Sequence, residues 1–193
     1  VQFLTDHQFA GFQRQWNSLL DRSNANSFFL KWEWLYTFWE TREDPAGSEL
    51  LAACCYEDEA LVGVAPLYVH RKKRFGFTIR EIRLLGDRVA SDFLDVFALP
   101  GYEERVCRAV VKELGAVPHD VMELKGIVAS SNLNRFLAPK LSRTHVEPFV
   151  VAPRAILPQS FEEYFSSLSR STRYMLRRKM RAGKNTIPMC RSC

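Results

Sequence analysis

The sequence predicts an α+β (mixed α/β) fold with a central, mostly antiparallel sheet flanked by helices. Two apolar runs, Leu50–Tyr56 and Ala60–Val69, flank the acidic turn Glu57-Asp58-Glu59, a pattern typical of an antiparallel hairpin. Two segments with aromatic residues at helical spacing precede this hairpin, and alternating strand and helix patterns follow it. Because every residue from Leu50 to Cys55 is apolar, we expect other elements to cover both faces of that strand.

Pro66 interrupts the second apolar run. A proline has no backbone N–H and cannot donate to a strand ladder. Pro66 therefore marks a sheet edge, a bulge or a place where neighbouring strands part.

Two helices are expected before the hairpin. Thr5-Asp6-His7-Gln8 has the pattern of a capping box, and the helix that it starts should end near Arg22. Leu4 and Phe9 are spaced to form a hydrophobic staple across the start of that helix. A second helix is expected over Phe28–Trp39, with its inner side formed by Trp32, Leu35, Tyr36 and Trp39.

The expected elements after the hairpin alternate between strands and helices. They are, in order, a basic turn over His70–Gly76, strands over Ile79–Leu85 and Ser91–Leu99, a helix from Tyr102 to Leu114 capped by Gly115, a strand over Val121–Ile127, a short helix over Ser130–Leu137 and an extended piece over Val146–Ala152.

A helical region closes the expected fold. Ser160-Phe161-Glu162-Glu163 predicts a second capping box, Ser169–Thr172 is a weak point, and a helical pattern then continues to Gly183. The expected organisation is a domain over residues 1–158, a helical connector over 159–184 and an irregular tail over 185–193.

The positive charge of the chain is concentrated in one segment. Arg170–Lys184 holds seven basic residues and no acid, and Arg191 adds one more, so the net charge of +5 leaves −3 on residues 1–169. Basicity is therefore a local feature, and a polyanion-binding surface over the whole protein is not indicated.

The cysteines and the hydropathy exclude several protein classes. Five cysteines, at positions 54, 55, 107, 190 and 193, do not form a secreted disulfide framework, and the lone Cys190–Cys193 pair lacks the second pair of a zinc site. No apolar run is long enough for a membrane span, and no signal peptide is visible. We expect a cytoplasmic protein without a metal site.

The most site-like feature is the acidic pair in Ser91-Asp92-Phe93-Leu94-Asp95. Carboxylates three residues apart on a strand point to opposite faces, so Asp92 and Asp95 cannot act on one atom. One of them can bind a cationic or hydroxylated ligand, while the other faces solvent or a helix N-terminus. The alternative is that both serve the turn at the strand end.

The basic segment allows two interpretations. Arg170, Arg173, Arg177, Arg181 and Lys184 lie along one helical face, and such a face can contact phosphates of a nucleic acid or of a cofactor. The alternative is a solvated face, or one that docks on an acidic neighbouring domain. Aromatic residues do not interleave with the basic ones for base stacking, which argues against a nucleic-acid partner.

Five motifs recur along the chain in a fixed order. They are Phe28-Phe29-Leu30 with Trp34-Leu35, Leu61–Leu67, Leu84-Leu85-Gly86, Ser91–Asp95 and Arg173–Arg181. Their order resembles the BioF2-like, CelD (BcsL)-type acetyltransferase family, which belongs to the GNAT superfamily and is related to the FemABX aminoacyl transferases. The resemblance covers roughly residues 3–184.

The resemblance implies a GNAT-like fold for residues 1–158 and an N-acyltransferase that uses acetyl-CoA or another acyl-CoA, in polysaccharide or lipid metabolism of the envelope. Members of the family resemble two GNAT-like halves, and the arginine-rich helix leads into the second half, which carries the acyl-CoA site. This chain would then be the N-terminal half, with a small-molecule acyl acceptor and either the missing half or a second copy as partners. Asp92 is the first residue to test for catalysis, Asp92 and Asp95 are candidate substrate ligands, and Arg173, Arg177 and Arg178 are candidate cofactor contacts. The competing hypothesis is a non-catalytic module that uses the basic helix over 170–184 on nucleic acid or anionic surfaces.

Overall fold

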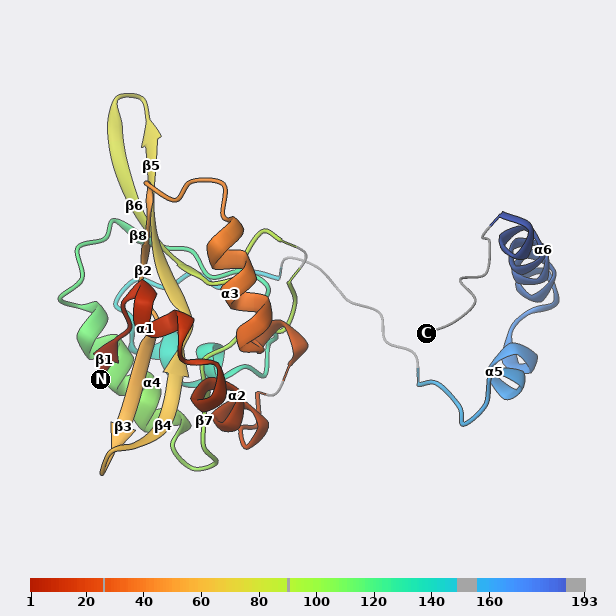
Figure 1. Ribbon diagram of the computed structural model, residues 1–193, viewed down its shortest axis with the longest axis horizontal. Coiled ribbons are helices and arrows are strands. Elements are labelled where there is room, and N and C mark those ends of the chain that lie inside the picture. The colour runs from red at the N-terminus through yellow and green to blue at the C-terminus, as the bar shows by residue number, and fades with distance from the viewer. Residues whose placement is uncertain (26, 90, 149–155, 187–193) are drawn as a thin grey trace. The chain divides into compact units, whose positions relative to one another are not determined.

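The computed structural model describes the chain except for residues 26, 90, 149–155 and 187–193, and the side chains of residues 183–186 (Figure 1). Contacts divide the chain into two compact units, Val1–His145 and Val146–Cys193. Part of the extended piece expected over Val146–Ala152, and the Cys190–Cys193 pair, lie outside the described residues.

The first unit contains two four-stranded sheets, which makes the fold α+β as the sequence predicts. One sheet has the order β1-β3-β4-β7 and is antiparallel throughout. Its strands are β1 (Gln2–Phe3), β3 (Ala53–Glu57), β4 (Ala60–Ala65) and β7 (Phe97–Ala98). The other has the order β2-β5-β6-β8, in which only β8 pairs in parallel. Its strands are β2 (Ser48–Leu50), β5 (Leu67–Arg74), β6 (Phe77–Leu84) and β8 (Val121–Met122).

The predicted hairpin is confirmed, and it crosses from one sheet to the other. β3 pairs with β4 in the first sheet, and β2 pairs with β5 in the second. The strands part at Pro66, whose carbonyl accepts a hydrogen bond of 2.8 Å from the N–H of Leu85. Of the three roles expected for this proline, the parting of strands is the one observed.

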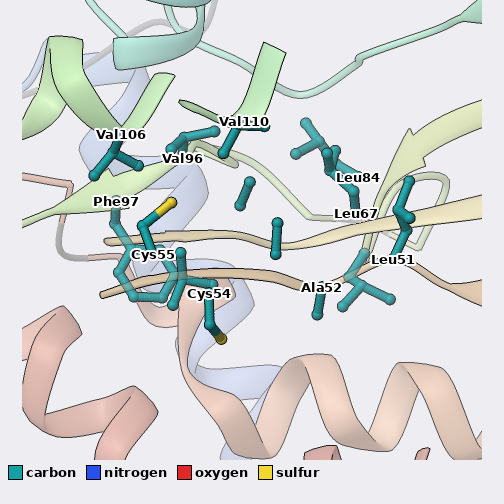
Figure 2. Close-up of a cluster of buried hydrophobic side chains, with 14 of the residues drawn as sticks. Leu51, Ala52, Cys54, Cys55, Leu67, Leu84, Val96, Phe97, Val106 and Val110 are labelled. Atoms are coloured by element: carbon teal, nitrogen blue, oxygen red, sulfur yellow. The ribbon is translucent and has the colours of Figure 1, made fainter. Parts of the chain in front are cut away.

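Helices cover both faces of the first sheet, as the apolar strand predicts. α2 (Gln13–Asp21) lies on one face, where Trp16 packs against Phe97 with ring centroids 5.4 Å apart. α4 (Glu103–Leu114) lies on the other, where Figure 2 shows Val106 and Val110 above the strands. The predicted helix at this position is confirmed, with Gly115 as its C-cap.

The two N-terminal helices are shorter than predicted. The capping box at Thr5 is present, but the first helix breaks at Gly11 into α1 (Asp6–Ala10) and α2, where the Gly11 N–H closes on the carbonyls of Gln8 and Phe9. The second breaks at Lys31 into a 3₁₀ turn, η1 (Phe28–Leu30), and α3 (Trp32–Thr41). Aromatic rings join the resulting segments, because Phe9 of α1 contacts Trp16 of α2 and both Trp32 and Tyr36 of α3.

Three predictions after the hairpin are wrong in their extent or type. The basic turn expected over His70–Gly76 is mostly strand, because β5 continues to Arg74 and the chain reverses at Phe75 and Gly76, both with positive φ. The strand expected over Ser91–Leu99 is reduced to β7, because Phe93 has a φ of 58° and cannot continue a ladder. The strand expected over Val121–Ile127 is likewise only β8.

Two short helical segments follow β8. The helix expected over Ser130–Leu137 is present as a π-helical segment, η2 (Leu133–Leu137), followed by a 3₁₀ turn, η3 (Ala138–Lys140), that contains Pro139.

The second unit contains α5 (Phe161–Ser167) and α6 (Arg170–Thr186). Ser160 caps α5 through the N–H of Glu163. The break between the helices lies at Leu168 and Ser169, so only the first residue of the weak point expected over Ser169–Thr172 is outside a helix. α6 includes Asn185 and Thr186, which the sequence assigns to an irregular tail. Within the described part of the chain, no helix has the length and apolar character needed to cross a bilayer.

Three cysteines of the first unit are expected to resist alkylation while the protein is folded. Burial raises the pKa of Cys54 to about 12, of Cys55 to about 11 and of Cys107 to about 12, so almost no thiolate exists at pH 8. Peptide mapping after iodoacetamide treatment should find these three unmodified in buffer and modified in denaturant. Labelling at similar rates in both conditions would contradict their burial.

Candidate functional site

The segment between β6 and β7, residues 85–96, holds several residues with positive φ, and we call it the β6–β7 loop. Gly86, Arg88 and Phe93 have positive φ values of 83°, 64° and 58°. Non-glycine residues adopt this region at a cost, and such residues cluster at functional sites when the surroundings hold them in place.

Trp34 of α3 fixes the loop from one side. Its indole Nε1 donates a hydrogen bond of 2.9 Å to Ser91 Oγ. A Cβ at Gly86 would lie 3.0 Å from Leu35 and 3.1 Å from Ser91 Oγ, so only glycine allows this close approach. On the other side the Leu94 N–H donates 3.0 Å to the carbonyl of Gly126.

An exposed aromatic cluster lies next to the loop. Phe28, Phe29 and Trp34 contact one another with ring centroids 5.4 to 5.7 Å apart, and Phe28 is 66% exposed. Asp92 directly follows the serine that Trp34 binds, and its side chain is exposed. The loop thus carries an exposed carboxylate one residue away from the serine that binds the aromatic cluster.

A buried polar cluster lies where the loop leaves β6. The Tyr68 hydroxyl donates 2.8 Å to Asp87 Oδ1. Asp87 Oδ2 is buried without a hydrogen-bond partner, and its ion pair with Arg88 Nε is long at 3.7 Å. Burial raises the pKa of Asp87 and the pKa of Tyr68 above their ordinary values.

Strand β6 adds a second ion pair to this cluster. Arg83 stands opposite Tyr68 across β5 and β6 and forms a buried ion pair with Glu81, while its Nε has no hydrogen-bond partner. His70 stands opposite Glu81, and burial together with the charge of Arg83 lowers its pKa. Buried groups with shifted pKa values and unused hydrogen-bonding atoms are typical of sites that act on a ligand or hold water.

The structure separates the two predicted carboxylates. Asp95 is 6% exposed, and its oxygens accept hydrogen bonds of 2.8 to 2.9 Å from the backbone N–H groups of Val96, Asn132 and Leu133. Two of these donors belong to the start of η2. Asp95 thus joins the loop to η2, whereas Asp92 faces solvent.

The predicted cofactor arginines lie on α6 in the second unit. Arg173 donates hydrogen bonds of 2.7 Å to the carbonyls of Ser166 and Leu168, so it caps the end of α5. The guanidinium of Arg177 lies 5.0 Å from the ring centroid of Phe165. Arg178 is exposed.

Sequence reasoning missed most of the loop's supports. Tyr68, Arg83 and Asp87 lie in strands and turns whose patterns indicate structure alone, and the Trp34–Ser91 bond joins residues far apart in the chain. In the described ranges, no group of three or more His, Cys, Asp or Glu residues is placed to hold a metal ion.

The chain resembles a solved structure in its fold, while comparisons at the level of families and of curated proteins find no match. A crystal structure described as an aminoglycoside acetyltransferase from an uncultured soil metagenomic sample aligns with 79% of this chain and 97% of its own, at 14% sequence identity and a TM-score of 0.48. A likeness at this level does not establish an activity.

Proposed function

We propose that this chain is the N-terminal half of a GNAT-like N-acyltransferase, which moves an acyl group from an acyl-CoA thioester to an amine. The observation that supports this proposal is the convergence of separate motifs on the β6–β7 loop. Phe28-Phe29 and Trp34 form its aromatic cluster, Gly86 lies against Leu35 and Ser91, and Ser91–Asp95 forms the loop itself. Three of the five segments whose order resembles the family thus meet at one place.

The proposed role of the loop is to bind the amine acceptor. A protonated amine is stabilised by a carboxylate and by the faces of aromatic rings, and the loop offers Asp92 beside Phe28 and Trp34. Asp95 positions the loop through its bonds to the backbone of η2. The buried hydrogen bond between Tyr68 of β5 and Asp87 joins the start of the loop to the sheet.

The reaction is a nucleophilic substitution at the thioester. The acceptor loses a proton, the neutral nitrogen attacks the carbonyl carbon, an N–C bond forms, and the C–S bond breaks. The thiolate takes up the second proton, which the nitrogen loses as the amide forms, and leaves as the free thiol of CoA. Asp92 is the group we propose as the first proton acceptor. In this proposal the acyl-CoA site belongs to the second half, reached through α6, where the exposed Arg178 is a candidate phosphate contact.

Binding of primary amines should depend on Asp92. We expect glucosamine or ethanolamine, titrated calorimetrically into the whole chain, to bind the wild type and to bind Asp92→Asn at least about tenfold more weakly, since hydrogen bonds to charged groups contribute about 1.5–3 kcal/mol. Asp58→Asn, at the exposed turn between β3 and β4, is the matched control and should bind like the wild type. Equal binding by Asp92→Asn, or no binding of any amine to the wild type, would contradict the proposed acceptor site.

Acetyl-CoA titrated under the same conditions tests the two-half proposal separately. We expect no heat of binding to this chain alone. Micromolar binding with turnover would show that the chain carries its own cofactor site, and would overturn the assignment of that site to a second half.

A further inference from the structure

The outer end of the ribbon formed by β5 and β6 extends beyond the other elements of the first unit (Figure 1). β2 pairs with β5 only up to His70, and β8 pairs with β6 only at Glu81 and Ile82. Residues 72–79 therefore pair in the sheet only with one another, across the two strands of the ribbon. We call residues 72–79 the ribbon tip, which has no further strand on either side among the described residues.

The ribbon tip is basic on both of its faces. Lys72, Lys73 and Arg74 are exposed, and the tip contains no acidic residue. Because successive side chains of a strand point to opposite faces, Lys73 lies on one face while Lys72 and Arg74 lie on the other. In the part of the chain that the structure describes, none of the three forms an ion pair with a carboxylate. The tip therefore carries uncompensated positive charge on both sides, which suits an anionic partner that surrounds it.

Two phenyl rings lie at the very end of the ribbon tip. Phe75 is 88% exposed and Phe77 is 75% exposed. Phe75 and Gly76 form the two-residue turn between the strands, with φ values of 49° and 82°. Asparagine or glycine is preferred at the first position of such a turn, and a bulky residue adopts a positive φ there at a cost in free energy. Packing within the described chain does not offset this cost, because the ring is exposed, whereas an apolar phase that covers the ring would offset it.

The order of these side chains along the ribbon favours a lipid surface over other polyanions. At about 3.3 Å per residue, the two lysines lie roughly 7 to 10 Å behind the turn that carries Phe75. Elements that bind a bilayer interface bury their apolar side chains about 5–10 Å deep, at the boundary of headgroups and acyl chains. Rings at the end and cations one step behind them match these two depths. A nucleic-acid strand would instead lie along one face, and would leave the cation of the other face and the ring at the end without contact.

We propose that the ribbon tip inserts end-on into the surface of an anionic lipid bilayer. Phe75 and Phe77 enter the boundary of the acyl chains, and the three cations bind headgroup phosphates on both sides of the ribbon. This contact holds the first unit at a membrane surface and does not depend on the proposed acyl transfer.

Vesicle co-sedimentation of the whole chain tests the role of the charges. We expect binding to mixed phosphatidylcholine–phosphatidylglycerol vesicles at low salt, and weaker binding at high salt. Lys72→Glu and Lys73→Glu, on opposite faces of the ribbon, should each weaken the partition coefficient by about tenfold or more. Arg143→Glu, at an exposed arginine of the first unit, is the charge-matched control and should leave it unchanged. Binding that responds to only one of the two lysines, or no binding at low salt, would overturn the proposal.

Phe75→Asn tests the role of the ring. Asparagine suits the turn, so the variant should be at least as stable to heat as the wild type. Its binding to the anionic vesicles should be about tenfold weaker, and its binding to a single-stranded oligonucleotide should equal that of the wild type. Because α6 is the same in both proteins, a difference between them reports on the ribbon tip alone. Unchanged vesicle binding would mean that the ring does not enter the bilayer, and oligonucleotide binding that falls in the variant would assign the tip to nucleic acid; either result overturns the proposal.

Discussion

At pH 4, replacement of Asp95 by alanine should lower the free energy of unfolding by about 3 kcal/mol or more. Its carboxylate accepts hydrogen bonds from the N–H groups of Val96, Asn132 and Leu133, and the side chain is almost completely buried. Alanine would leave these three donors without a partner, at a cost of roughly 1–3 kcal/mol for each one that water cannot reach. The loss should also loosen the β6–β7 loop, which Asp95 joins to η2.

The effect of this substitution should depend on pH in a defined direction. Burial raises the pKa of Asp95 to about 6, against the lowering effect of its three N–H donors, while the ordinary value is 3.8. The folded protein therefore holds this proton more tightly than the unfolded chain. The stability contributed by this group is fully present below pH 4 and is lost as the pH rises through 6. The difference in the free energy of unfolding between wild type and variant should therefore shrink by up to about 3 kcal/mol between pH 4 and pH 6.

Urea unfolding of both proteins at several pH values between 4 and 7 measures this difference. All other titratable groups are shared by the two proteins, so their contributions largely cancel. Asp92→Ala, three residues earlier and exposed, is the control and should change stability by less than about 0.5 kcal/mol. A difference that grows with pH would contradict a raised pKa for Asp95.

The central hairpin could be predicted because its signals are local. Apolar runs on both sides of Glu57-Asp58-Glu59 define two strands and a turn, and the missing N–H of Pro66 marks the point where the sheets part. The helix from Glu103 to Leu114 was predictable for the same reason, since its apolar spacing and its C-terminal glycine are adjacent in sequence.

The candidate site could be predicted only in part, because tertiary contacts determine it. Ser91–Asp95 has the alternation of a strand, but the bonds of Ser91 to Trp34 and of Leu94 to Gly126 hold it as a loop. The positive φ of Phe93 is a result of those contacts, and no local pattern indicates it. The Tyr68–Asp87 bond likewise depends on the pairing of β5 with β6, which brings residues from two strands together.

Gly63 in β4 illustrates how one small residue sets the distance between a helix and a sheet. A Cβ at this position would lie 2.3 Å and 2.6 Å from the two γ-carbons of Val106, so α4 packs directly on the strand backbone. Gly63→Ala should therefore lower the free energy of unfolding by about 1–3 kcal/mol, because the helix or the strand must move.

Removal of the opposing methyl groups should relieve much of this cost. Val106→Ala alone opens a small cavity and destabilises the protein, whereas the new Cβ of Gly63→Ala partly fills that space in the double variant. We expect the double variant to be more stable than the sum of the two single effects predicts, with an interaction free energy of at least about 0.5 kcal/mol. Chemical unfolding of the four proteins of this cycle measures the coupling. If the two effects are additive, the side chain of Val106 does not pack directly on Gly63, and the proposed contact between α4 and β4 is contradicted.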